Sequence, residues 1–395
     1  MRVPAAEISG GLVAFNDRYA WEENDFAPLR REESLWLYAR DGDLEYWAAD
    51  LHLHPPRLRY RFGLRTGDGL RWYGWDGLRE EPAPKGAFEF AYLAEGDAPD
   101  GPAWAAGATF YQIFPDRFAR SREPHRRESV EPWGARPGRK SFMGGDLDGI
   151  IEKLDHIESL SVDGLYLTPI FTSPSNHKYD TSDYFTVDPD FGGNPALRRL
   201  IDALHARGMK LILDGVFNHV GSQWPPFRDV LQRGGTSPFA RWFYMADEDG
   251  DQAQDLGAKV ARLAASLPYE TWSNNVAAMP KLRSSEPEVR DLICRVGRFW
   301  IQEFGIDGWR LDVANEVDHR LWRAFRSAVR GVDREAFLVG EIWSSAMPWL
   351  RGDQFDSTMN YPLREAVLDY TGKGSLDGVG FLDAFDRIRA TYPEP

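Results

Sequence analysis

The chain has 395 residues, of which 43% are hydrophobic, 13% aromatic and 27% charged. An apolar fraction of this size is ordinary for a folded globular protein and argues against wholesale disorder. Acidic residues outnumber basic residues by 61 to 47, and the net charge is −14. This charge argues against a surface that binds nucleic acid or anionic membrane, because both need a basic field.

The first hundred residues have the pattern of antiparallel β-structure. Apolar side chains at every second position of 58–64 alternate with arginines, which is typical of a strand with one buried face. The turn sequence 66–69 contains two glycines and predicts a hairpin. We therefore expect residues 1–103 to form an N-terminal antiparallel β-sandwich, which ends in the Pro- and Gly-rich linker 96–102.

From residue 104 onward the pattern changes to short apolar strands followed by amphipathic helices. Strands are expected at 108–114, 164–168, 209–214, 308–313, 336–341 and 355–359, and the clearest helices at 194–208, 285–304 and 317–330. Asn194 is expected to cap the first of these helices. Alternating strands and helices build a parallel sheet, which is either open or closed as a (β/α)8 barrel.

A long insertion interrupts this alternation. Residues 217–286 follow the third strand and are rich in Pro, Gly, Asp and Trp. A connection of this length predicts an inserted subdomain, which usually shapes a site. The expected domains are thus 1–103, the first part of the barrel at 104–216, the insertion at 217–286, and the rest of the barrel at 287–395.

Polar residues gather where the expected strands end. The third strand ends in Asp214 and leads to His219, the fourth carries Arg310 and Asp312, and the fifth ends in Glu341. In a parallel barrel this edge holds the active site. Each residue alone has a commoner structural explanation, such as an ion pair or a core imidazole. Their order along consecutive strands favours a site.

Asp312 and Glu341 fit the cleavage of a glycosidic bond. One carboxylate must be ionised to attack or stabilise the anomeric carbon, and the other must donate a proton to the leaving oxygen. Arg310 next to Asp312 is expected to favour its charged form, whereas Ile342 and Trp343 are expected to desolvate Glu341 and keep it protonated.

The chain resembles the α-amylase family of glycoside hydrolases in three defining motifs: DGVFNH (214–219), GWRLDVANE (308–316) and GEIW (340–343). Further matches are FYQIFPDRF (110–118), GGDLDGI (144–150) and SNHKYDTSDYF (175–185). MPKLR (279–283) and the ANE ending of the second motif are similar to the cyclomaltodextrinase, neopullulanase and maltogenic amylase branch. The resemblance implies a TIM (β/α)8-type barrel, of which this chain holds about six of eight strands. It also implies that the N-terminal sandwich is a starch-binding-type module that helps to form a homodimer.

The resemblance implies a role for each matching residue. Asp312 would be the nucleophile and Glu341 the acid/base of a retaining mechanism. Arg310 would hold Asp312, and Asp214 would support the arginine. Six residues would line the substrate site, either at the cleaved sugar (His177, Tyr179 and His219) or on the leaving-group side (Asn315, Glu316 and Trp343).

Two departures from the family pattern bear on function. The fourth motif, a His-Asp pair after the seventh strand, has no counterpart, since Asp318-His319 has the reverse order at the start of a helix. Strands seven and eight and the C-terminal domain are also missing, so we expect a fragment, or a protein that a second chain completes, with little or no hydrolase activity in isolation. The loop 119–124, where this branch often binds calcium, carries arginines. We therefore expect no calcium there, no other metal and no cofactor.

The expected function is hydrolysis of α-1,4-glucosidic bonds in cyclodextrins, pullulan or short maltooligosaccharides. A glucanotransferase or sugar isomerase with the same covalent intermediate, and a non-catalytic glucan-binding fragment, stay open as alternatives. Cys294 is the single cysteine, and the sequence has neither a signal-peptide pattern nor an apolar stretch of membrane-spanning length. These features predict a cytoplasmic protein that binds neither membrane nor nucleic acid.

Overall fold

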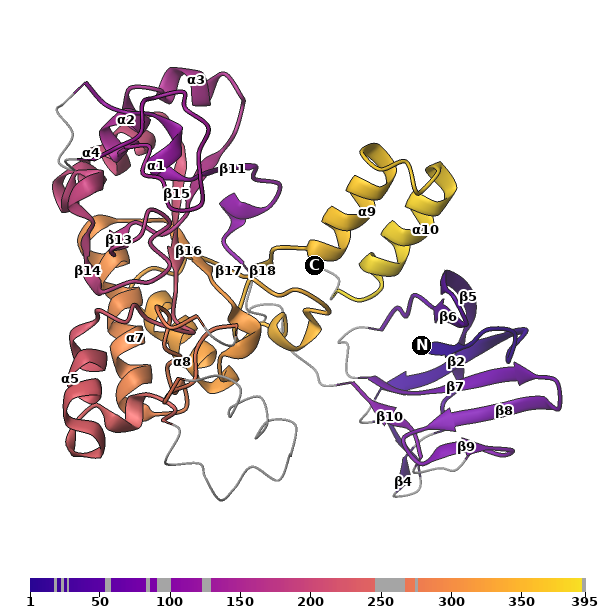
Figure 1. Ribbon diagram of the computed structural model, residues 1–395. Coiled ribbons are helices and arrows are strands. Elements are labelled where there is room, and N and C mark those ends of the chain that lie inside the picture. Colours follow the sequence, from indigo (N-terminus) through magenta and orange to yellow (C-terminus); the bar gives the residue numbers. More distant parts are fainter. Residues whose placement is uncertain are drawn as a thin grey trace. The chain divides into compact units, whose positions relative to one another are not determined.

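The computed structural model describes residues 1–17, 20–22, 25–26, 28–53, 58–82, 86–90, 101–122, 129–245, 267–273 and 276–392. The chain divides into two compact units, Met1–Pro99 with Asn360–Pro395, and Asp100–Met359 (Figure 1). The expected linker at 96–102 lies largely outside the described residues. The expected domain limits stay a prediction.

An antiparallel sheet dominates the first unit, as expected. Its strand order is β1-β6-β5-β2-β7-β8-β9, with β10 paired to β7. The bounds are β1 (Arg2–Pro4), β2 (Gly10–Asp17), β5 (Arg31–Asp41), β6 (Leu44–Ala48), β7 (Leu58–Thr66), β8 (Gly69–Gly74), β9 (Gly77–Arg79) and β10 (Phe88–Glu89), and β3 (Trp21–Glu22) pairs with β4 (Asp25–Phe26). The predicted hairpin is β7–β8, closed by the pair Thr66 and Gly69.

The two halves of this sheet share strand β5. Residues 31–35 pair with β2 and residues 36–41 pair with β6, and the register shifts between Leu37 and Ala39. Apolar side chains from both halves pack together on a core of Ile8, Val13, Leu35 and Leu64, against which Val3 and Trp47 lie partly buried. Burial of this shared core stabilises the N-terminal fold.

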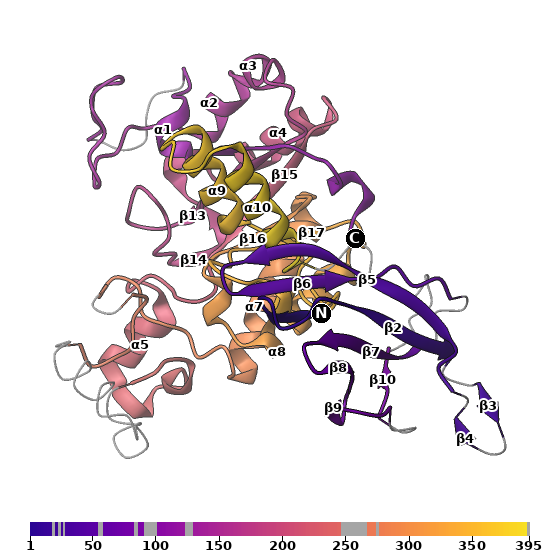
Figure 2. The same ribbon diagram turned by 90° about the vertical axis from the view of Figure 1, so that its right-hand side faces the viewer.

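Two helices complete the first unit. They are α9 (Tyr361–Thr371) and α10 (Gly378–Arg389), and they lie side by side with the rings of Tyr370 and Phe381 stacked at 5.1 Å (Figure 2). Asn360 caps α9 by accepting a hydrogen bond from the Leu363 amide.

A six-stranded parallel sheet forms the centre of the second unit and confirms the predicted barrel-type architecture. Its strands are β11 (Phe110–Ile113), β12 (Gly164–Leu167), β15 (Lys210–Gly215), β16 (Gly308–Leu311), β17 (Phe337–Gly340) and β18 (Ser357–Thr358), and they lie in chain order. All residues of β12 and β16 are buried, as expected for parallel strands that are covered on both faces. A short antiparallel pair, β13 (Phe171–Thr172) and β14 (Asp183–Val187), follows β12.

Helices follow these strands. They are α1 (Pro115–Phe118), α2 (Leu147–Ile151), α3 (Leu154–Glu158), α4 (Gly193–His205), α5 (Pro225–Arg233), α7 (Pro287–Phe299) and α8 (His319–Arg330). Figure 1 shows α7 and α8 side by side, next to β16 and β17. A Cβ atom at Gly308 would lie 2.2 Å from the carbonyl oxygen of Phe337, so β16 approaches β17 as closely as only glycine allows.

The expected cap at Asn194 is wrong. Helix α4 begins at Gly193, and its N-cap is Gly192, with φ +97°. The Asn194 side chain instead accepts a hydrogen bond from the Val187 amide and donates to the Phe185 carbonyl. The side chain therefore ties β14 to the helix, because a tertiary partner satisfies it better than its own helix start.

The described part of the insertion is held by isolated bridges between distant residues. His219 pairs with Lys281, Phe243 with Leu282, Met245 with Tyr269 and Thr271 with Pro280. Residues 246–266 and 274–275 lie outside the described part. Across the described ranges, no helix combines the length and apolar character that a bilayer crossing requires.

Candidate active site

A cavity of about 330 Å³ lies where the parallel strands end. Its lining residues are His177, Tyr179, His219, Trp272, Met279, Arg310, Asp312, Val313, Glu341 and Trp343. Asp312 directly follows β16 and Glu341 directly follows β17, so the parallel sheet brings both carboxylates to one edge. All the predicted site residues line this cavity except Asp214, Asn315 and Glu316.

The guanidinium of Arg310 bonds to three carboxylates at once. Its Nη1 lies 2.9 Å from Asp214 Oδ1 and 2.7 Å from Asp312 Oδ1, and its Nη2 lies 2.8 Å from Glu341 Oε1. One planar group therefore holds both predicted catalytic carboxylates, which confines them to the same small volume.

Burial controls the charge of this cluster. Burial first, and then the charge of Asp214, raise the pKa of Asp312 to about 8. Arg310 acts in the opposite direction, as the sequence suggested, but it is outweighed. Burial also raises the pKa of Asp214. For Arg310, burial lowers the pKa, but the neighbouring carboxylates raise it well above its usual value, so the guanidinium stays charged.

Glu341 has a second donor besides Arg310. The backbone amide of Val313 donates to Glu341 Oε2 at 2.9 Å. Val313 adopts φ +44° and ψ +41°, a left-handed conformation that is costly for a β-branched residue. Of the two residues expected to desolvate Glu341, Ile342 is buried but Trp343 is 50% exposed, so Trp343 faces solvent and the cavity instead.

Asp214 is buried and lies outside the cavity lining. Besides Arg310, its Oδ2 accepts hydrogen bonds from the hydroxyls of Tyr166 at 2.5 Å and Tyr179 at 3.1 Å. The sequence pattern did not mark Tyr166, which lies in a wholly buried apolar strand. The signal that could have found it is the hydroxyl itself, because a buried tyrosine needs a hydrogen-bond partner.

The two predicted histidines have different surroundings. His219 is 1% exposed, and burial lowers its pKa to about 4, so its imidazole is neutral near pH 7. Its Nε2 atom has no hydrogen-bond partner within the described part of the chain. His177 Nδ1 lies 3.1 Å from both the Tyr179 amide and Ser175 Oγ, and burial lowers its pKa as well.

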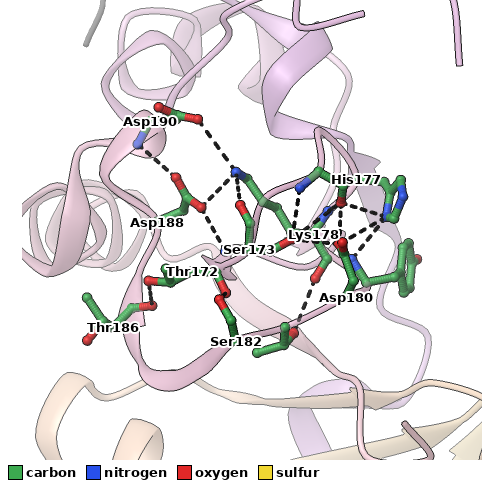
Figure 3. Close-up of polar contacts among 12 residues, drawn as sticks. Thr172, Ser173, His177, Lys178, Asp180, Ser182, Thr186, Asp188 and Asp190 are labelled. Atoms are coloured by element: carbon green, nitrogen blue, oxygen red, sulfur yellow. Dashed lines mark hydrogen bonds and ion pairs between the residues drawn. The ribbon is translucent and has the colours of Figure 1, made fainter. Parts of the chain in front are cut away.

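A buried lysine anchors the loop that carries His177 and Tyr179. Lys178 is 1% exposed and has φ +61°. Its Nζ lies 2.7 Å from Asp188 Oδ2 and 3.6 Å from Asp190 Oδ2. Figure 3 shows this side chain extending toward the two aspartates, away from the imidazole of His177. The lysine therefore fixes the backbone between two cavity-lining residues.

Besides Asp214, two predicted residues lie outside the lining, and three lining residues were not predicted: Trp272, Met279 and Val313. Asn315 and Glu316 lie in a short 3₁₀ turn outside the lining, and Glu316 pairs with Lys281 at 3.1 Å. Trp272 and Met279 come from the insertion, and the ring of Trp272 lies 5.8 Å from that of His219. The sequence motif MPKLR (279–283) begins with Met279, whereas no local sequence pattern indicated Trp272.

Across the described residues, no group of three or more His, Cys, Asp or Glu side chains is arranged to hold a metal. In the loop 119–124, Arg120 donates to the carbonyl oxygens of Glu131 and Met143. Residues 123–128 lie outside the described residues.

Comparisons with known proteins agree with this geometry. The alpha amylase catalytic domain matches residues 112–388, and the alpha amylase N-terminal ig-like domain matches 5–94. Neopullulanase 2 of Thermoactinomyces vulgaris is 44% identical over 397 residues, which cover 100% of this chain and 65% of that protein. A cyclomaltodextrinase of Geobacillus thermopakistaniensis is 40% identical over 390 residues, which cover 97% of this chain and 63% of that protein.

A solved cyclomaltodextrinase structure matches with a TM-score of 0.86 and 37% identity, and the match covers 99% of this chain and 65% of that one. The chain thus spans slightly less than two thirds of the length of these relatives. The catalytic-domain match extends over more than half of the chain and includes every strand that carries a cavity carboxylate. This chain therefore belongs to the α-amylase family.

Proposed function

We propose that the cavity is the active site of a retaining hydrolase that cleaves α-1,4-glucosidic bonds in cyclodextrins, pullulan or maltooligosaccharides. The observation that carries the proposal is the shared guanidinium of Arg310, which bonds to both Asp312 and Glu341. The names of the relatives, neopullulanase and cyclomaltodextrinase, support the substrate class.

The chemistry needs one ionised and one protonated carboxyl group. Asp312 attacks the anomeric carbon while Glu341 gives its proton to the glycosidic oxygen, so the carbon–oxygen bond breaks and the leaving sugar departs as an alcohol. Glu341 then takes a proton from water. The resulting hydroxide attacks the glycosyl-enzyme ester, releases Asp312 and restores the original anomeric configuration.

The charge of the cluster accounts for the single proton that the reaction needs. Three carboxyl groups surround one guanidinium in a buried site, and one cation cannot offset three buried negative charges. The cluster is therefore expected to retain a proton near neutral pH. Burial raises the pKa of Asp312 to about 8, so in the free protein this proton lies on Asp312 at neutral pH. The reaction requires the proton on Glu341 once a glucan occupies the cavity.

The rest of the lining fits a neutral sugar. Tyr179, Trp272 and Trp343 offer flat rings to the apolar faces of a pyranose. The neutral imidazole of His219 offers an unpartnered Nε2 to a hydroxyl. An uncharged substrate meets no repulsion from the net charge of −14.

A trapping experiment tests the nucleophile even if turnover is slow. A 5-fluoro α-glucosyl fluoride has a good leaving group, and its ring fluorine slows hydrolysis of the ester intermediate. We expect mass spectrometry to find one glucosyl adduct on the peptide that contains Asp312. Labelling of another residue, or no labelling with the wild-type chain, would contradict the proposal.

Steady-state assays on β-cyclodextrin, pullulan and maltotriose test the reaction itself, and they also decide whether the chain in isolation turns over little substrate. Asp312→Asn and Glu341→Gln are expected to lower kcat by about 1,000-fold or more. The matched control is Asp307→Asn, because Asp307 is a buried carboxylate paired with His205 and Lys210. Longer products than the substrate would indicate glucanotransferase activity, and binding without turnover a non-catalytic fragment.

Further expectations concern assembly and location. We propose that the protein is a cytoplasmic homodimer that associates through its N-terminal unit. Sedimentation velocity tests the dimer and would also detect a second chain that completes the barrel, if the chain is purified from its own cells. Cell fractionation tests the location.

A further inference from the structure

We propose that Tyr166 is a positioning residue whose buried hydroxyl fixes Asp214 against Arg310 and thereby holds the guanidinium on Asp312 and Glu341. The catalytic meaning of this role rests on the proposed function, whereas the contacts themselves do not. Tyr166 lies outside the cavity lining, so it acts through its neighbours rather than on the sugar.

The strand register explains why Tyr166 reaches Asp214. Tyr166 on β12 pairs with Ile212 on β15, and Asp214 lies two residues further along, on the same face of that strand. The Tyr166 hydroxyl donates to Asp214 Oδ2 at 2.5 Å. Its ring centroid lies 5.8 Å from the central carbon of the Arg310 guanidinium. Tyr166 therefore contacts both members of the ion pair.

Asp214 transmits this contact to the catalytic carboxylates. Its two oxygens accept from Arg310 Nη1 at 2.9 and 3.1 Å, and the same Nη1 donates to Asp312 at 2.7 Å. Any turn of the Asp214 carboxylate would thus move the donor that Asp312 uses. Tyr166 and Tyr179 share Asp214 Oδ2, and together they oppose such a turn.

The hydroxyl also affects the charge of Asp214. Burial raises the pKa of Asp214, and Arg310 together with the hydrogen bond from Tyr166 lowers it again. The other titratable groups around the cluster are Asp312, Glu341, Tyr179, Tyr184, and the neutral imidazoles His177 and His219. Removal of the Tyr166 hydroxyl is expected to raise the pKa of Asp214 further. As the pH falls, the state with Asp214 and Asp312 both ionised is therefore lost at a higher pH in the variant than in the wild type.

A matched pair of variants isolates this effect. Tyr166→Phe removes the hydroxyl that bonds to a carboxylate. Tyr184→Phe removes an equally buried hydroxyl, which donates to the backbone carbonyls of Val216 at 2.8 Å and His219 at 3.2 Å. Both variants lose a buried hydrogen bond, but only the first loses one to a titrating group.

The first measurement is the urea midpoint of each variant at a series of pH values from about 4 to 8, the range between the ordinary pKa of aspartate and the raised pKa of Asp312. The urea midpoint of Tyr166→Phe is expected to fall further below that of the wild type as the pH rises, because the lost hydrogen bond is stronger when Asp214 is ionised. The difference for Tyr184→Phe is expected to stay constant. Parallel, pH-independent offsets for the two variants would overturn the proposal.

The second measurement is the pH profile of kcat/KM. Tyr166→Phe is expected to lower kcat/KM by roughly tenfold to hundredfold, mostly through kcat, and to shift the acidic limb up by roughly half a pH unit or more. Tyr184→Phe is expected to leave the limb in place. An unmoved limb in Tyr166→Phe refutes the positioning role. A wild-type chain that neither turns over substrate nor forms the glucosyl adduct on Asp312 refutes the proposed function alone, because the urea series needs no activity.

Discussion

The backbone amide of Val313 lies 2.9 Å from Oε2 of Glu341, although Val313 must adopt φ +44° to place it there. The turn that ends β16 therefore links the residue after one carboxylate to the side chain of the other. A strained conformation that persists beside two functional groups indicates that the surrounding structure enforces it.

This link can be tested at Val313 itself. Val313→Gly retains the amide and tolerates positive φ, but it also removes a side chain that is only 2% exposed. We therefore expect it to destabilise the protein by about 1 to 3 kcal/mol and to keep kcat within about tenfold of wild type. Val313→Pro fixes φ near −65° and removes the donor, so its kcat is expected to fall at least about 100-fold below that of the glycine variant. Equal kcat values for two folded variants would show that the amide has no role.

Asp312 is expected to cost stability at neutral pH. Its pKa in the folded protein is raised to about 8, so the unfolded chain ionises first as the pH rises above about 4. The contribution of Asp312 to the free energy of unfolding is therefore most favourable at low pH and is lost as the pH rises toward 8. Asp312→Asn removes this loss, and we expect it to stabilise the protein by about 1 to 2 kcal/mol at pH 8 and by little at pH 4. Urea unfolding at both pH values measures the difference, and a gain that is larger at low pH would contradict the pKa direction.

Lys178 is expected to be essential for the loop that carries His177 and Tyr179. Lys178→Met removes the ammonium that contacts Asp188 and Asp190, and breaking a buried ion pair on one side costs about 3 to 5 kcal/mol. The double variant Lys178→Met/Asp188→Asn removes one charge from each side and is expected to recover part of that loss. Thermal unfolding of both variants provides the measurement, and equal melting temperatures would argue against the pair.

The contact between β16 and β17 depends on Gly308. Gly308→Ala would place a Cβ 2.2 Å from the Phe337 carbonyl oxygen, and we expect it to destabilise the protein by about 2 kcal/mol or more. Gly235→Ala is the matched control, because a Cβ there meets nothing within 4 Å. Its stability is expected to stay within about 0.5 kcal/mol of wild type. Similar effects of the two substitutions would contradict the close approach.

The parallel sheet and its polar edge could be predicted from the sequence because both follow from local pattern. Short apolar runs alternate with amphipathic segments, and in parallel strands the residues after each run meet at one edge. Arg310, Asp312 and Glu341 could be placed together on this ground alone, without knowledge of the distances between them.

Other parts of the site depend on long-range geometry that no local pattern contains. Tyr166 resembles a core residue until the register of β12 on β15 brings it to Asp214. Trp272 reaches the cavity through an irregular segment that isolated bridges hold in place. Glu316 was expected to line the site but lies outside the lining and pairs with Lys281, a partner from the insertion that no local pattern indicates.

The shared guanidinium of Arg310 also limits how this chemistry can be altered, in evolution or by design. Since one cation serves both acids, a substitution near either acid changes the proton affinity of the other. An attempt to give the proposed active site a new working pH by adjusting one carboxyl group will therefore also change the protonation of the other. A change of working pH therefore calls for substitutions near both acids at the same time.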